Sequence, residues 1–65
     1  MLLRVNGQPV EMPNPCSVAD LLRHFPVRGR HAVEVNGDIV PRSMHATRQL
    51  AGGDRVEIVQ AIGGG

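Results

Sequence analysis

The residues of this sequence with the most distinctive chemistry are the last four, Ile62-Gly63-Gly64-Gly65. Glycine lacks a Cβ atom, so a run of glycines can be thin, extended and locally unrestrained. At about 3.3 Å per residue, these four residues would carry the carboxylate of Gly65 roughly 13 Å from the rest of the protein. We therefore expect a tail that threads a narrow channel of another protein, with Gly63 and Gly64 in the channel and Gly65 at the reacting end.

The group that would react is the α-carboxylate of Gly65. An α-carboxyl group has an ordinary pKa of about 3.5, so it is ionised and unreactive at neutral pH. It becomes an acyl donor only when a partner attaches a leaving group, as ATP does by adenylation with Mg²⁺ held by that partner. Sulfur can then replace the adenylate and leave a thiocarboxylate on Gly65. The alternative reading is a frayed chain end or a fusion scar.

Cys16 and the three histidines are the other candidates for chemistry. Cys16 precedes a predicted helix start, where a thiol pKa can fall, but nothing nearby supports a nucleophile, and we favour a packing thiol. His24, His31 and His45 lack the short, paired spacing of zinc ligands. No nucleophile elbow, His-flanked serine or P-loop occurs. We therefore expect no enzyme, no metal site and no permanently bound cofactor.

The composition favours one small domain with few classes of partner. The chain of 65 residues has one Phe and no Trp or Tyr, so its single core must be aliphatic. A net charge of +1, without basic runs or stacking aromatics, argues against nucleic acid. No apolar run approaches the roughly 20 residues of a membrane span. One Cys, which cannot form an internal disulfide, favours a reducing compartment, and we expect a cytoplasmic protein.

Two Asn-Gly pairs predict two β-hairpins, because Asn-Gly is a preferred type I′ turn. The first pair would join strands at residues 2–5 and 8–12, and the second would join strands at 31–35 and 38–40. Pro9 cannot donate a hydrogen bond to a neighbouring strand. Its strand should therefore lie at an edge of the sheet.

Residues 17–25 carry the signals of one short helix. Ser17 and Asp20 form a capping-box pattern at its start. Apolar residues then recur at helical spacing, and Pro26 ends the element. We expect the buried stripe to consist of Val18, Leu21, Leu22 and Phe25.

The order strand, strand, helix, strand, strand, strand predicts an α+β fold with a five-strand mixed sheet packed on one helix. The connection through the helix permits parallel pairing, which would place the first strand beside the last one, residues 55–61, in the middle of the sheet. Residues 42–49 would form a single helical turn, and Leu50 would plug the core. The domain then covers residues 1–61, and residues 62–65 form a flexible glycine tail.

The last strand also offers a docking surface beside the tail. Val59 and Ala61 should face away from the core, and Ile62 lies at the root of the tail. This apolar group could align the tail with an activating enzyme, while Arg42 and Arg48 pair with acidic residues of the partner. The alternatives are an ordinary scatter of exposed apolar residues and solvated charges.

All seven basic residues are arginines, and no lysine is present. Compositional drift accounts for this. The absence of lysine has a chemical consequence, because an activated Gly65 would meet no side-chain amine of its own molecule, only the N-terminal amine. We hypothesise that the absence of lysine lowers self-acylation.

Four stretches of the chain resemble the ThiS family of sulfur carriers, and together they span nearly the whole sequence. They are SVADLL at the helix start (17–22), VEVNGDIVPRS in the second hairpin (33–43), GGDRVEIV in the turn and last strand (52–59) and the terminal IGGG (62–65). The loops at residues 13–16 and 25–30 have no counterpart that we can match to the family.

The resemblance implies a ubiquitin-like β-grasp fold and a function. A ThiF-like, E1-type enzyme would adenylate Gly65 with ATP and Mg²⁺, and a sulfur donor such as a cysteine desulfurase would supply the sulfur. The thiocarboxylate would then deliver that sulfur to a ThiG-like thiazole synthase in thiamine biosynthesis. The alternatives are a MoaD-like carrier for molybdopterin synthesis and a ubiquitin-like modifier or interaction domain.

Overall fold

Two Asn-Gly turns organise the sheet of this protein in a computed structural model, which describes residues 1–60. They connect β1 (Leu2–Val5) to β2 (Gln8–Glu11) and β3 (His31–Val35) to β4 (Asp38–Val40). Asn6 and Asn36 have φ angles of 49° and 52°, and the glycines that follow have φ angles of 83° and 89°. These left-handed pairs are what a type I′ turn requires, so both predicted hairpins are confirmed.

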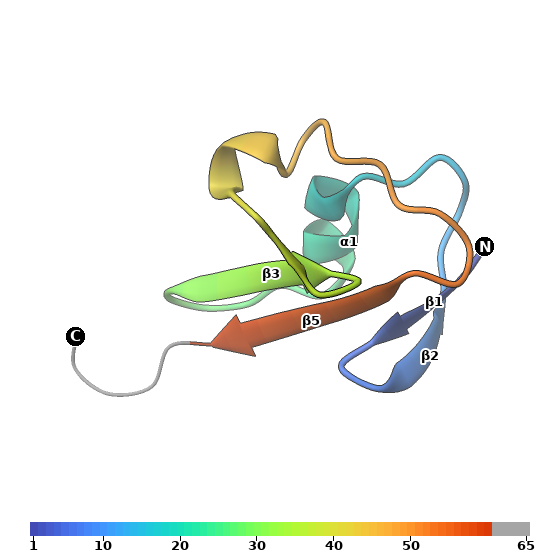
Figure 1. Cartoon of the computed structure of the whole chain (residues 1–65), viewed down its shortest axis with the longest axis horizontal. Helices are drawn as coiled ribbons and strands as arrows, with labels where there is room; N and C mark the ends of the chain where they lie inside the picture. Colours follow the sequence, from blue (N-terminus) through green and yellow to red (C-terminus); the bar gives the residue numbers. More distant parts are fainter. Residues whose placement is uncertain (61–65) are drawn as a thin grey trace.

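The sheet has the strand order β2-β1-β5-β3-β4, with β5 (Arg55–Gln60) in the middle (Figure 1). β5 runs parallel to β1 and antiparallel to β3, so the sheet is mixed, as predicted. The strand that contains Pro9 lies at an edge, where one side of its backbone needs no partner. The first and last strands are parallel neighbours, and the chain between them includes the helix that connects β2 to β3.

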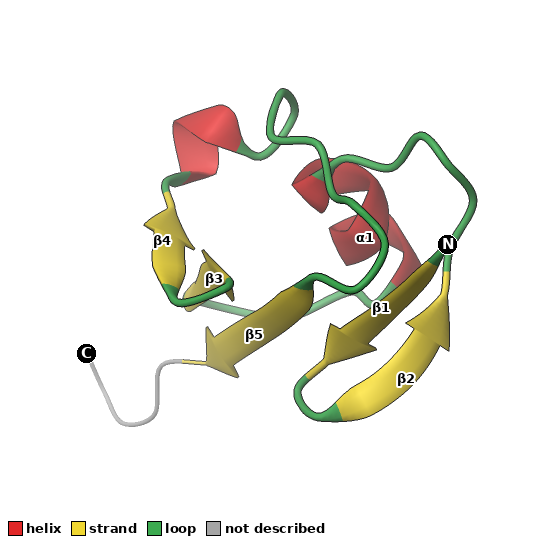
Figure 2. Ribbon diagram, turned by 45° about the vertical axis from the view of Figure 1, so that its right-hand side comes forward, coloured by secondary structure: helices red, strands yellow, loops and turns green. Residues whose placement is uncertain are grey.

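The helix α1 (Val18–His24) covers one face of this sheet (Figure 2). It begins with the predicted capping box: the Asp20 amide donates to the Ser17 hydroxyl at 3.0 Å, and the Ser17 amide donates to the Asp20 carboxylate at 2.9 Å. These two bonds satisfy amides that a helix start otherwise leaves without partners. Val18 and Leu21 are fully buried against the sheet.

Phe25 does not complete the buried stripe of the helix, and this prediction was wrong. The helix ends at His24, and Phe25 is the C-cap residue with φ −122° and ψ 77°. Its backbone has left the helical conformation ahead of Pro26, and its ring lies in the opening between the helix end and the sheet. The side chain is 36% exposed.

The core is aliphatic, as the composition requires. Its buried members are Leu3, Val5, Met12, Cys16, Val18, Leu21, Val33, Val35, Val40, Leu50 and Val56. Leu50 fills the core after the short helical turn η1 (Arg42–Met44), and its amide donates to the Cys16 carbonyl at 2.8 Å. The predicted plug and helical turn are therefore present.

Candidate docking face and tail root

The central strand β5 leads the chain directly to residue 61. Its side chains alternate: Val56 is buried and Ile58 packs on the core, whereas Val59 is 55% exposed on the opposite face. The outward position predicted for Val59 is thus observed. The predictions for Ala61, Ile62, Gly63, Gly64 and Gly65 fall outside the described residues.

Two asparagine side chains fix the position of β5. Backbone pairing between β1 and β5 covers only Arg4 and Val5 on β1. Beyond it, Asn6 Oδ1 accepts from the Ile58 amide at 2.7 Å and Asn6 Nδ2 donates to the Ile58 carbonyl at 3.3 Å. The side chain of Asn6 therefore extends the ladder along β5.

The second hairpin holds the start of the same strand in a similar way. Asn36 Oδ1 accepts from the Arg55 amide at 2.9 Å, and Asn36 Nδ2 donates to the Asp54 carboxylate at 2.9 Å. Sequence reasoning assigned both asparagines to turns only. Because their partners lie 18 to 52 residues away, no local pattern indicates this second role.

Three exposed apolar residues lie on the outer face of the sheet: Val59, Ala32 and Ile39. Ala32 lies directly across from Val59 on β3, and Ile39 on β4 lies across from Glu34. Ile39 is 68% exposed. Sequence reasoning did not single it out, although the alternation of residues 38–40 places it on the face opposite the buried Val40.

The two arginines predicted to contact a partner beside Val59, Ala61 and Ile62 differ in their surroundings. Arg42 begins η1, directly after β4 and Pro41, and its side chain is exposed. Arg48 is half-buried, and its guanidinium donates to the Gln49 carbonyl at 2.7 Å. Arg42 is therefore the freer of the two for contact with a partner.

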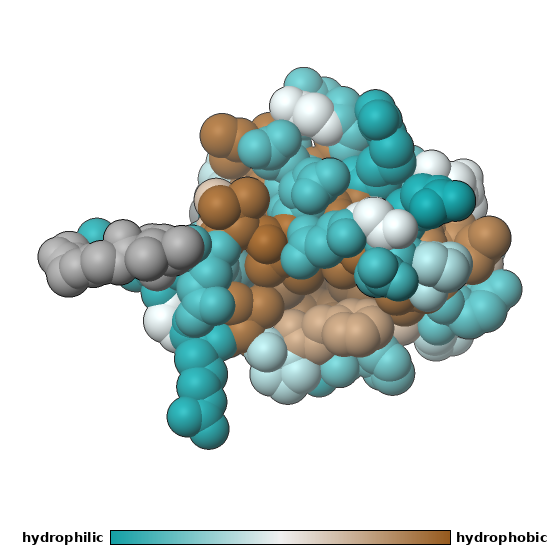
Figure 3. All heavy atoms as spheres, turned by 90° about the horizontal axis from the view of Figure 1, so that it is seen from below, coloured by the Kyte–Doolittle hydropathy of each residue, from teal (hydrophilic) through white to brown (hydrophobic). Residues whose placement is uncertain are grey.

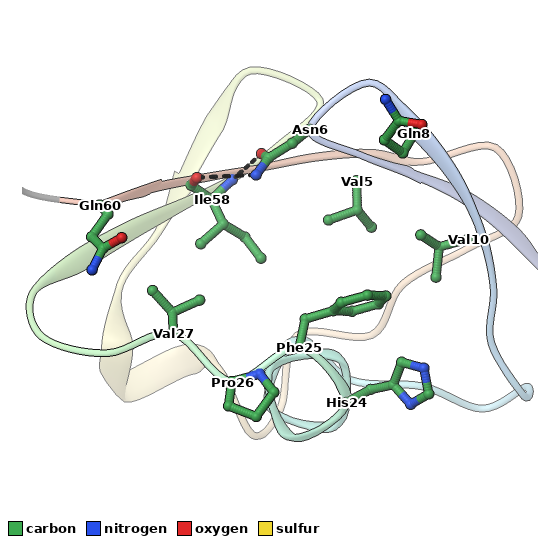
Figure 4. A pocket seen from close by; sticks show the side chains of 10 residues that line it. All are labelled: Val5, Asn6, Gln8, Val10, His24, Phe25, Pro26, Val27, Ile58 and Gln60. Atoms are coloured by element: carbon green, nitrogen blue, oxygen red, sulfur yellow. Dashed lines mark hydrogen bonds between the residues drawn. The ribbon is translucent and has the colours of Figure 1, made fainter.

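A groove of about 530 Å³ opens between the end of α1 and the sheet, and Figure 3 shows hydrophobic side chains gathered around this hollow. Phe25 and Val27 point into it from one side and Val5, Val10 and Ile58 from the other (Figure 4). Phe25 thus lines the groove instead of the core. Gln60 closes one end and donates to the Arg28 carbonyl at 2.7 Å.

Cys16 is a packing residue, as we favoured from the sequence. It is 1% exposed, and its thiol contacts the Ser17 carbonyl at 3.5 Å. Burial, with a smaller contribution from the negative charge of Asp20, raises the pKa of the Cys16 thiol. A raised pKa leaves little thiolate at neutral pH, so the structure gives Cys16 no nucleophilic character.

The histidines are engaged locally, and the rings of His31 and His45 lie 6.5 Å apart between centroids. The ring of His24 is exposed and meets Phe25 edge-on at 4.8 Å between centroids. His31 and His45 each contact a backbone carbonyl, those of Gly29 and Val40. Among residues 1–60, no group of three or more His, Cys, Asp or Glu side chains is arranged to hold a metal ion.

Within the same range, none of the helices has the length and apolar character needed to cross a bilayer.

The strand order, the mixed pairing and the single helix packed on one face together define a ubiquitin-like β-grasp domain. The particular family follows from a model of the ThiS family, which matches residues 3–65. The chain belongs to the ThiS family.

Two solved structures support the assignment. The crystal structure of the thiamine biosynthesis protein ThiS of Geobacter metallireducens superposes with a TM-score of 0.84 at 32% identity, over the whole of both chains. An NMR structure of a thiamine biosynthesis protein from that organism gives a TM-score of 0.80 at 33% identity, over all of this chain and 88% of the other.

Two proteins related to this chain in sequence differ from each other in length. The uncharacterized protein ycf40 of Porphyra purpurea is 30% identical over 64 residues, which cover 97% of this chain and 90% of the relative. A thiazole synthase of Paramagnetospirillum magneticum is 41% identical over 66 residues, which cover all of this chain. This chain spans only 20% of that longer relative.

Proposed function

We propose that this protein is the sulfur carrier of thiamine biosynthesis and that it carries sulfur as a thiocarboxylate on Gly65. The observation that carries the proposal is the match to the ThiS family over residues 3–65, which includes the glycine terminus. The protein itself performs no catalysis. Its part is to present one acyl group to partners that supply the chemistry.

Sulfur would be loaded onto Gly65 in two steps. A carboxylate oxygen of Gly65 attacks the α-phosphorus of ATP in an E1-like enzyme, pyrophosphate leaves, and an acyl adenylate forms. Hydrosulfide, released from the persulfide of a cysteine desulfurase by a thiol that is oxidised to a disulfide, then attacks the acyl carbon, AMP leaves, and Gly65 carries the thiocarboxylate. Mg²⁺ and the phosphate contacts belong to the activating enzyme.

The acceptor that we propose is a thiazole synthase. Support comes from the Paramagnetospirillum magneticum thiazole synthase, because one fifth of that polypeptide resembles this whole chain. Fusion of a carrier-like segment to the enzyme would keep sulfur donor and acceptor together.

The position of β5 in the described structure suits the presentation of Gly65 to a partner. The strand is central, and Asn6 and Asn36 fix it from both hairpins. We assign partner contact to Val59 and Arg42, and also to Ala61 and Ile62. Gly63 and Gly64 would pass through the channel of the partner, where any Cβ atom would add width.

Intact mass spectrometry tests the proposal. The chain is incubated with its E1-like enzyme, ATP, Mg²⁺, a thiol reductant and a desulfurase with cysteine, beside a variant that lacks Gly65. Exchange of one oxygen for sulfur adds about 16 Da to the wild-type chain, and we expect no gain in the variant. A product heavier by a whole protein would indicate a modifier instead. Sulfur transfer to a molybdopterin synthase rather than to a thiazole synthase would indicate the MoaD-like alternative.

A further inference from the structure

The strand β5 is paired unequally along its two edges. On one edge it pairs with β3 as far as Gln60, the last residue of the strand. On the other edge its pairing with β1 stops at Val56, whose carbonyl accepts from the Asn6 amide at 2.8 Å. Within the described part of the chain, residues 57–60 therefore have a neighbouring strand on one edge only.

The side chain of Asn6 replaces the missing strand at one position. A primary amide carries an acceptor oxygen and an N–H donor, as a peptide unit does. Asn6 Oδ1 accepts from the Ile58 amide at 2.7 Å, and Asn6 Nδ2 donates to the Ile58 carbonyl at 3.3 Å (Figure 4). The backbone of Asn6 has a φ of 49° and begins the turn away from β5. Asn6 thus follows the end of β1 and still continues its hydrogen bonding to β5.

A second side chain ties the end of β5 to the connection between α1 and β3. Gln60 Nε2 donates to the Arg28 carbonyl at 2.7 Å. The part of β5 that only one strand covers is therefore held by side-chain bonds at two places, Ile58 and Gln60. Of the two, the bonds at Ile58 lie on the edge that β1 leaves open.

We infer that Asn6 is a positioning residue for the activation of Gly65, an inference that rests on the proposed function. It acts by keeping residues 57–60 in one conformation before the activating enzyme binds. A strand end that is already ordered loses less conformational entropy when the chain beyond it enters a channel. Asn6 acts through Ile58, seven residues before Gly65, so its loss should weaken binding and leave the chemical step unchanged.

Asn36 provides a matched control in the same strand. It also begins an Asn-Gly turn, with a φ of 52°. Its side chain also makes two hydrogen bonds, with the Arg55 amide and the Asp54 carboxylate, each at 2.9 Å. These bonds hold the start of β5. Loss of either asparagine side chain should therefore cost similar stability, but only loss of Asn6 should release the end that leads to Gly65.

The test replaces each asparagine with glycine, which adopts positive φ without strain and so removes the side-chain bonds alone. Pyrophosphate release by the activating enzyme with ATP measures KM for this chain and kcat, at a temperature at which both variants are folded. We expect Asn6→Gly to raise KM about three- to tenfold with kcat within about twofold of the wild type. Asn36→Gly should leave both constants within about twofold.

Hydrogen exchange of the Ile58 amide tests the physical step without the enzyme. It should be about tenfold or more faster in Asn6→Gly than in the wild type, because Asn6 Oδ1 is the acceptor of that amide, and close to the wild-type rate in Asn36→Gly. Asn6→Asp keeps the acceptor but lacks the donor, so its KM and exchange rate should lie between those of the wild type and Asn6→Gly. This variant also carries the test if Asn6→Gly is not folded.

The outcomes separate this inference from the proposed function. If the wild type is adenylated and Asn6→Gly has an unchanged KM, or both glycine variants have equally raised KM values, the positioning role is wrong and the proposed function stands. A lower kcat with an unchanged KM would also overturn the positioning role. If the active enzyme releases no pyrophosphate with the wild type, the proposed function fails and this inference fails with it.

Discussion

Asp20 has two roles at the start of α1, because its carboxylate accepts the Ser17 amide and contacts Arg23. The hydrogen bonds with Ser17, backbone first, hold the pKa of Asp20 below its ordinary value of 3.8, and the charge of Arg23 acts in the same direction. A carboxyl group whose pKa is lower in the folded protein than in the unfolded chain stabilises the fold when it is ionised.

We predict that this contribution is present at neutral pH and is lost as the pH falls from 3.8 through the folded pKa. Wild-type protein should be more stable than Asp20→Asn by a constant amount above about pH 5, and the difference should shrink below it. Denaturant unfolding of both proteins across this range measures the difference. A gap that persists unchanged in acid would contradict the role of the ionised carboxylate.

Cys16 gives a second prediction. Because the thiol is buried and its pKa is raised, iodoacetamide should modify the native protein many times more slowly than the protein in denaturant. Mass spectrometry of timed samples measures both rates. Cys16→Ala should still accept sulfur on Gly65. Equal rates in the two conditions, or loss of sulfur loading in this variant, would show a reactive role.

The absence of lysine becomes testable with the structure in hand. The one amine of the chain, on Met1, donates to the Met12 carbonyl at 2.6 Å and pairs with Glu11 at 3.1 Å. His31 lies opposite Gln60, so Arg30 lies beside the end of β5, whereas Arg23 lies on α1. Lysine at residue 30 would put a free amine within reach of an activated Gly65.

We predict that adenylation of Arg30→Lys yields a self-acylated product about 18 Da lighter than the starting chain, because an amide forms and the adenylate leaves. Arg23→Lys, with the same chemical change at a distance, should yield much less of it. Intact mass after incubation with ATP and the activating enzyme, without a sulfur source, measures both. Equal products from the two variants and the wild type would leave compositional drift as the sufficient explanation.

At the scale of elements, the turns between strands depend on single glycines. Gly53 has a φ of +89°, which L side chains rarely adopt, whereas Gly52 beside it has an ordinary φ and an open site in which a Cβ would approach Met1 no closer than 3.9 Å. These neighbours form the turn that introduces β5. A comparison of alanine substitutions at these two positions therefore tests whether the turn requires a glycine at positive φ.

We predict that Gly53→Ala lowers the free energy of unfolding by about 1 kcal/mol, because alanine is strained at positive φ. Gly52→Ala should leave it unchanged or raise it by up to about 1 kcal/mol, since alanine restricts the unfolded chain. Urea unfolding of both variants decides this. Equal destabilisation would show that the positive φ of Gly53 does not set the requirement.

The elements that local signals encode were predictable from the sequence. The Asn-Gly turns at residues 6–7 and 36–37 and the capping box of Ser17 and Asp20 each act over a few residues, and all three formed as expected. The neighbouring positions of the first and last strands were predicted because the helix provides the crossover connection that parallel pairing needs.

The features that the sequence did not reveal depend on the register between strands or on a change of backbone conformation at one residue. The opposition of Glu34 and Glu57 follows only from the alignment of β3 with β5. The bonds from Asn6 to Ile58 join residues 52 positions apart. Phe25 satisfied the helical spacing, but the helix ended one residue before it, and its ring lines the groove.

At the scale of the whole molecule, the fold acts as a support that presents β5. The strand lies in the middle of the sheet, packs its inner side chains on the core and exposes Val59 on its outer face. Stability therefore resides in residues that differ from those proposed to react. We expect removal of Gly65 to leave the unfolding midpoint within about 1 °C of the wild-type value, because a terminal glycine buries almost no side-chain area.

The central claim is that the carboxylate of Gly65 accepts sulfur after adenylation, and intact mass is its most direct measurement. With the E1-like enzyme, ATP, Mg²⁺ and a sulfur source, the wild-type chain should gain about 16 Da, located on the terminal residue by fragmentation. The gain should require ATP and should be absent from the folded variant that lacks Gly65. An unchanged mass of the wild-type chain with active partners, or the same gain without Gly65, would contradict the account.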